Sequence, residues 1–259
     1  MNFQFQIDGW QAGIRPGDGS EEDWEILGSA PLDAIATDQT VTIPKMLNRR
    51  LAKLPKRVAS SAAELPGVRD ATYVVCSRHG DFERALRLLR GLADEEGVSP
   101  TDFSLSVHNM LAGVLSIAAE NAQAHTAMAA GADTFVFGMM EALTLLASEQ
   151  AQSVMLLLYD TPLPGEYANL ESPWEGAAMV MAALLSRRKN GCEELEPSSF
   201  TATLLPGRLG SQGFEQGTIA QAEAFVRFLE NPEIAQESRG ERIGWRWSKD
   251  MNTERPEHA

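Results

Sequence analysis

Cysteine, histidine and long apolar runs are all scarce in this sequence. Its 259 residues include two cysteines, too few for a disulfide framework, which favours a reducing compartment such as the cytoplasm. No apolar stretch reaches the roughly 18 residues that a membrane-spanning helix needs, and the first residues lack the basic and apolar regions of a signal peptide. The four histidines show no ligand spacing with cysteines or acidic residues, so no metal site is expected. These absences indicate a soluble cytoplasmic protein.

Basic residues are outnumbered by acidic ones, and the formal net charge is −14. This balance argues against a nucleic-acid partner, because phosphate binding requires clustered lysine and arginine. The segment 45–57 is an exception, since it contains six basic residues and no acidic one. Such a patch suits an acidic protein partner, and a solvated helix face gives the same pattern. The candidate docking residues within it are Arg49, Arg50, Lys53 and Arg57.

Apolar periodicity predicts an α/β fold. The apolar segment 71–76 suits a buried strand, and Asp81 can cap a helix that begins at Phe82, which gives a strand–turn–helix unit. Helices are predicted at 43–65 (interrupted near Pro55), 82–93, 103–119, 134–147 and 218–229. Strands are predicted at 3–7, 71–76, 153–159, 178–184, 200–205 and 243–247. The rest of the first 39 residues is expected to be irregular, and a single domain over 1–247 is expected to precede a disordered tail at 248–259.

Three motifs carry a family resemblance. The most specific lies at 99–117, where the segment SVHNMLAGVLSI (106–117) follows the pattern Ser-x-x-Asn-x-x-Ala-Gly-x-x-Ser-Ile of a ketosynthase helix. The other two are IPKMLNRRL (43–51) and CSRHGD (76–81). In their order and rough spacing these motifs resemble the β-ketoacyl synthase-like N-terminal family over about residues 40 to 185. The resemblance implies a truncated, thiolase-like α/β/α layered fold with a mixed central sheet.

The resemblance also implies where a working ketosynthase carries its nucleophilic cysteine. That position lies in a strand-to-helix turn, here 129–135, where the start of the helix lowers the thiol pKa. This turn contains no cysteine, and the nucleophile position corresponds to Asp133 or, with a shift of one residue, to Ala132. Asp133 either caps the following helix or uses its carboxylate in place of a bound acid group. The pair of catalytic histidines is missing too, because the one histidine after the turn is His258 in the predicted tail.

The resemblance therefore implies a non-catalytic subunit similar to a chain-length factor of fatty acid, polyketide or aryl polyene synthesis. Such a subunit forms a dimer with an active β-ketoacyl-ACP synthase, and it uses no cofactor beyond the phosphopantetheine that an acyl carrier protein presents. The nearly uncharged segments 103–119 and 134–147 favour a partner interface. The residues expected at this interface or along an acyl channel, each of which also suits an ordinary core, are Ser106, His108, Asn109, Met110, Leu111, Leu115, Phe135 and Phe137.

Two other functions are compatible with the sequence. The nearly uncharged helices suit a homodimeric scaffold that binds an acyl carrier protein and never meets a ketosynthase. An independent acyltransferase or hydrolase would instead use Cys76 and His79, which lie three residues apart, as nucleophile and base.

Overall fold

The computed structural model describes residues 1–16, 19–20, 22–29, 40–95, 97–167, 170, 177–187, 199–207 and 217–250. Cys192, His258 and the predicted tail beyond Asp250 lie outside these residues. None of the helices in the described ranges combines the length and the apolarity that crossing a membrane requires.

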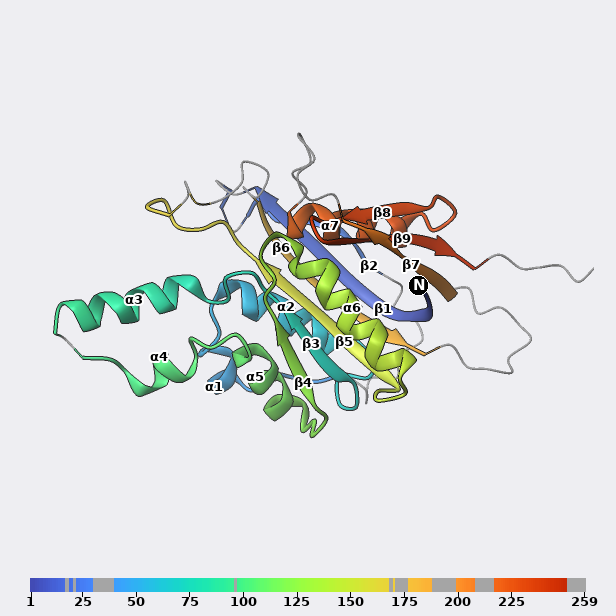
Figure 1. Ribbon diagram of the computed structural model, residues 1–259. Coiled ribbons are helices and arrows are strands. Elements are labelled where there is room, and N and C mark those ends of the chain that lie inside the picture. Colours follow the sequence, from blue (N-terminus) through green and yellow to red (C-terminus); the bar gives the residue numbers. More distant parts are fainter. Residues whose placement is uncertain are drawn as a thin grey trace, which may run out of the picture.

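The strands of the described part form one nine-stranded mixed sheet (Figure 1). They are β1 (Asn2–Pro16), β2 (Glu25–Ser29), β3 (Thr72–Cys76), β4 (His125–Met128), β5 (Ser153–Asp160), β6 (Ala177–Ser186), β7 (Ser199–Pro206), β8 (Gln236–Arg239) and β9 (Ile243–Lys249). The order in the sheet is β4-β3-β5-β6-β1-β7-β9-β8, and β2 pairs with β1. β3 runs parallel to β4 and β5, whereas the other pairings are antiparallel.

Helices cover both faces of this sheet. They are α1 (Lys45–Asn48), α2 (Lys53–Glu64), α3 (Phe82–Ala93), α4 (Pro100–Ser104), α5 (Met110–Ala119), the 3-10 turn η2 (Gly131–Asp133), α6 (Thr134–Ala147) and α7 (Thr218–Glu230). α6 and α7 pack on one face, in a core with Trp245 and Trp247 of β9. α2 and α5 pack on the other, in a core with Tyr73 and Tyr159. The predicted α/β/α layers and mixed sheet are therefore confirmed.

Two helices begin with a side-chain cap, and the cap of α3 is the predicted one. The Asp81 carboxylate accepts a hydrogen bond from Arg84 N at 3.2 Å at the start of α3. Ser99 Oγ accepts one from Asp102 N at 3.3 Å, and Pro100 occupies the first turn of α4. These side chains satisfy backbone N–H groups that have no partner within the helix, which stabilises both helix starts.

Other elements differ from the predictions. The helix expected at 43–65 is two helices, α1 and α2, and Pro55 lies in the first turn of α2, where its missing N–H costs nothing. The helix expected at 103–119 is likewise divided into α4 and α5. β1 continues to Pro16, β9 continues to Lys249, and β2, β4 and β8 were not predicted. β2, β4 and β8 have four or five residues each, too few for a clear periodic pattern.

α3 and α4, within residues 82–95 and 97–107, form an arm that extends away from the layered body (Figure 1). Several large apolar side chains of this arm face solvent. The exposed fraction is 62% for Leu89, 65% for Phe103 and 44% for Val107. Contiguous exposed apolar groups commonly mark interaction surfaces, so the arm is a candidate contact region.

Two helical glycines give a matched test of packing. A Cβ at Gly138 of α6 would lie 2.1 Å from Cys76 Sγ, whereas a Cβ at Gly113 of α5 would meet nothing within 4 Å. We expect Gly138→Ala to lower the free energy of unfolding by about 1–3 kcal/mol through overpacking. Gly113→Ala should raise it by about 0.5–1 kcal/mol, because alanine favours the helix.

Urea denaturation of the two variants measures these differences. A Cys76→Ala background should remove most of the cost of Gly138→Ala, because the clashing sulfur is gone. Equal effects of the two glycine replacements would contradict this account of the contact between α6 and β3.

Candidate functional site

The turn between β4 and α6 holds a buried carboxylate. The side chain of Asp133 has an exposed fraction of 0%. Its Oδ1 accepts hydrogen bonds from Glu241 N at 2.8 Å and from Gln221 Nε2 at 3.4 Å. Its Oδ2 accepts from Arg242 N at 2.9 Å and Arg242 Nε at 3.1 Å. Four donors thus surround a carboxylate that would be costly to bury without them.

The position of Asp133 before α6 was predicted, but the cap was not formed as expected. Asp133 is the residue that precedes the helix, yet its side chain makes no capping hydrogen bond. Thr134 Oγ1 instead organises the turn, since it accepts from Ala130 N at 2.9 Å and donates to Gly131 O at 2.7 Å. The Asp133 carboxylate turns toward the connection between β8 and β9, where unpaired backbone N–H groups are available.

Two further contacts close this turn. A Cβ at Gly240 would lie 2.6 Å from Asp133 Oδ1 and 2.3 Å from Ile243 O, so a glycine is needed for the β8–β9 connection to approach the carboxylate. The Arg242 guanidinium lies over the Phe137 ring, 4.7 Å from its centroid, and also donates to Ala130 O. Asp133, one of the two residues predicted at the nucleophile position, is therefore enclosed by contacts internal to the chain.

The residues predicted for an acyl channel lie in different places. Met110, Leu111 and Leu115 are buried with α2 and β3 on one face of the sheet. Phe135 is fully buried on the opposite face, 5.8 Å from the ring of Phe225, and Phe137 is partly buried beside it. The sheet separates the two sets, so the structure does not bring them together around one cavity.

The polar residues before α5 border the arm. Ser106 Oγ donates to Phe103 O at 2.8 Å, and Asn109 precedes α5 without capping it. The His108 imidazole packs on Gly80, and its buried Nε2 has no hydrogen-bond partner within the described ranges. His108 thus lies at the base of the arm, packed on Gly80.

Cys76 and His79 lack the features of a nucleophile and its base. Cys76 is fully buried in the α6-side core, and burial raises the pKa of its thiol above the ordinary range. A reactive cysteine needs the opposite shift. Burial, followed by the charges of Arg78 and His108, lowers the pKa of His79 to about 4, so this ring is neutral at neutral pH.

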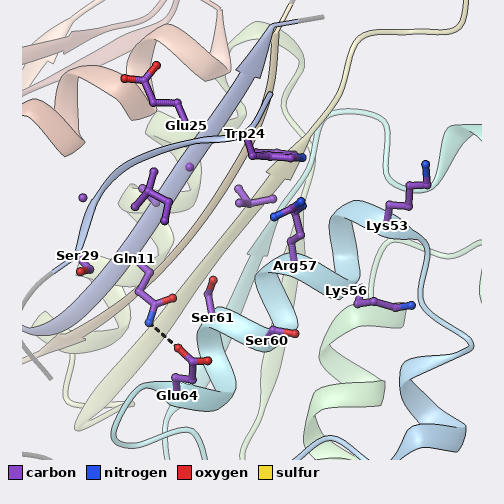
Figure 2. A pocket seen from close by; sticks show the side chains of 15 residues that line it. Gln11, Trp24, Glu25, Ser29, Lys53, Lys56, Arg57, Ser60, Ser61 and Glu64 are labelled. Carbon is purple, nitrogen blue, oxygen red and sulfur yellow. Dashed lines mark hydrogen bonds between the residues drawn. The ribbon is translucent and has the colours of Figure 1, made fainter. Parts of the chain in front are cut away.

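The predicted docking residues are divided between an open surface and a cleft. Arg49, Arg50 and Lys53 are exposed at the end of α1 and the start of α2, and Lys53 also lines the cleft. Arg57 is half-buried, with its guanidinium 4.7 Å from the centroid of the Trp24 ring. Figure 2 shows Arg57 beneath Trp24, inside a cleft between α2 and β2.

β4 forms an open edge of the sheet. In the described part of the chain it pairs with β3 alone, through bonds such as Ser77 N to Met128 O at 3.2 Å. Successive residues of a strand direct their backbone groups to opposite sides, so His125 and Ala127 point theirs away from β3. Both residues are exposed. No charge or proline blocks this edge against another strand.

Comparison with known proteins identifies the family. The model of the β-ketoacyl synthase N-terminal domain matches residues 22–248, which is most of the chain. The chain therefore belongs to the β-ketoacyl synthase N-terminal domain family. No curated protein matches its sequence.

Solved structures with the same fold include ketosynthases and chain length factors. A chain of the ketosynthase (ApeO) in complex with its chain length factor (ApeC) from Xenorhabdus doucetiae is 26% identical, with a TM-score of 0.70. The match covers 95% of this chain and 99% of that one, so the two have nearly the same length. The ishigamide ketosynthase/chain length factor is 13% identical, with a TM-score of 0.56 and coverage of 88% and 73%.

A third similar structure contains a type II PKS acyl-carrier protein in complex with its ketosynthase bound to the hexaketide. The matched chain is 12% identical, with a TM-score of 0.53 and coverage of 90% of this chain and 77% of that one. At these identities the second and third structures show the fold alone.

The hydrogen bonds of Asp133 predict a structural role. Asp133→Ala should lower the free energy of unfolding by about 3 kcal/mol, because it leaves two backbone N–H groups and a guanidinium without their acceptor. Arg242→Gln should cost about 0.5–1 kcal/mol, since the Arg242 side chain is 51% exposed and its charge is screened.

Denaturant titration measures both changes, and Asp94→Ala at an exposed position of the arm is the matched control. Amide hydrogen exchange at Glu241 and Arg242 should accelerate in Asp133→Ala. Unchanged exchange at these two amides would contradict the proposed anchoring of the β8–β9 connection.

Proposed function

We propose that this chain is a non-catalytic, chain-length-factor-like subunit that pairs with an active β-ketoacyl-ACP synthase. The observation that carries the proposal is the turn before α6, where the predicted nucleophile position Asp133 holds a buried carboxylate with four donors and the turn contains no cysteine. Asp133 has no side-chain surface through which a thioester could reach it. The family membership and the similarity to a chain of a ketosynthase–chain length factor complex support the same conclusion.

The partner would pack along the β4 edge and the adjoining arm. β4 offers outward backbone groups at His125 and Ala127, and the arm offers Leu89, Phe103 and Val107. Ile117 of α5, with an exposed fraction of 67%, is a further apolar group on the helix that leads to β4. A strand edge flanked by apolar side chains suits a protein partner, because backbone pairing fixes the register and apolar burial supplies affinity. Pairing through this surface is the basis of the proposed dimer.

The acyl carrier protein would dock on the exposed basic residues Arg49, Arg50 and Lys53. These side chains lie on a protein whose formal net charge is −14, so the positive patch is local. An acidic carrier would be steered to it by long-range attraction that falls with ionic strength. Its phosphopantetheine arm would then deliver the acyl chain to the partner's active site.

Co-expression with a candidate ketosynthase tests the pairing. The pair should co-purify, and chain elongation should require both proteins. Ala127→Pro removes an outward N–H without touching the bonds to β3, and it should weaken the complex about tenfold through lost backbone pairing and steric conflict. Ala127→Thr keeps the N–H and serves as the control. Purification of this chain alone as a homodimer, with elongation unaffected, would instead favour the carrier-binding scaffold.

Charge reversal tests the carrier site. Arg49→Glu combined with Arg50→Glu should weaken carrier binding about tenfold at low salt and less at high salt, as expected for exposed charges. Arg227→Glu, at an exposed position on α7, should leave binding unchanged. Equal affinities of the wild-type and doubly reversed proteins, measured by calorimetry, would remove the docking assignment.

A further inference from the structure

A cleft between α2 and β2 lies away from the turn that holds Asp133. It has a volume of about 620 Å³ and is bounded by β2 on one side and α2 on the other, with β1 and Val180 of β6 between them. Asp133, by contrast, joins α6 to the β8–β9 connection on the opposite face of the sheet. A cleft of this volume is large enough for a small-molecule ligand.

One stripe of α2 supplies the polar side of the cleft. Arg57, Ser61 and Glu64 recur at spacings of four and three residues, so they lie along the same helix face. Figure 2 shows Arg57 and Glu64 at two ends of this stripe, with Ser61 between them. Seven residues separate the two ends, which corresponds to about 10 Å along a helix.

The two ends of the stripe carry opposite charges, a guanidinium at Arg57 and a carboxylate at Glu64. At one end the Arg57 guanidinium stacks on Trp24, whose buried indole Nε1–H has no hydrogen-bond partner within the described ranges. At the other end Glu64 Oε2 accepts from Gln11 Nε2 at 3.0 Å, so the end group is an acceptor. An anion suits the first end and a hydrogen-bond donor suits the second.

The cleft between the ends has apolar walls. Val180 is buried in the floor, and Ile26 of β2 lines the cleft with an exposed fraction of 81%. Glu25, the other acidic residue of the lining, points away from α2 in Figure 2. An apolar ligand body would therefore cover Ile26 without meeting the Glu25 carboxylate.

We propose that this cleft binds a small extended acid with a hydroxyl or amide donor about 10 Å from its anionic group. The anion pairs with Arg57 and accepts from Trp24 Nε1, the apolar body lies on Ile26 and Val180, and the terminal donor bonds to Glu64. This binding needs neither the partner subunit nor the carrier, so its test is independent of the proposed function.

A rigid probe series tests the chemistry in the purified chain. 4-Hydroxycinnamate carries a carboxylate and a hydroxyl at opposite ends of a planar frame. Cinnamate lacks the donor, and 4-carboxycinnamate places a second carboxylate against Glu64. We expect saturable quenching of Trp24 fluorescence by 4-hydroxycinnamate, weaker binding of cinnamate by about fivefold, and still weaker binding of 4-carboxycinnamate. Loss of the quenching in Trp24→Phe would assign the fluorescence signal to Trp24. Ligand-observed NMR measures the affinity independently of this fluorescence.

Variants locate the probe. Arg57→Gln should weaken 4-hydroxycinnamate at least about tenfold, because a charge-assisted hydrogen bond is lost. Ser61→Leu should block the cleft while leaving Arg57 in place. Arg49→Gln, on the open surface, should bind the probe like the wild type, and circular dichroism confirms folding of each variant. The proposal is overturned if the probe does not saturate by about 10 mM, or if Arg57→Gln and Ser61→Leu bind it as the wild type does.

Discussion

The fold depends on the way in which one buried carboxylate is satisfied. Asp133 lies at the junction of β4 and α6, and its two oxygens accept from Glu241 N and Arg242 N more than a hundred residues later in the chain. This contact fixes the β8–β9 connection against α6, and α7 and β9 then complete the core on that face through Phe225, Trp245 and Trp247. A charge with no access to water is tolerated there because every donor is supplied by the protein itself.

The turn between β4 and α6 is held by side chains of the chain itself. Thr134 closes it with hydrogen bonds to Ala130 and Gly131. Within the turn, the Asp133 carboxylate is enclosed by donors, and the Arg242 guanidinium lies over Phe137. The role of this turn therefore has to be argued from its own contacts and not from the family fold alone.

The candidate binding surfaces lie away from the hydrogen bonds of Asp133. The β4 edge and the apolar arm present backbone groups and large side chains to solvent, whereas the α2–β2 cleft presents a stripe that runs from Arg57 to Glu64. The sheet divides the proposed channel residues into separate cores, with Leu111 and Leu115 on one face and Phe135 on the other.

The sequence by itself determined the elements whose signals are local. Helix α3 begins after its cap Asp81, and helix α6 begins at Thr134 as the apolar periodicity predicts, because these signals act within one or two turns. Three motifs indicated the family, and the absence of a cysteine from 129–135 follows directly from the sequence. Only the tertiary structure decided what Asp133 does, since its donors come from α7 and the β8–β9 connection, which are distant in the sequence. It likewise placed Arg57 under Trp24, because contacts between separate elements depend on how the layers pack and leave no periodic signal in the chain.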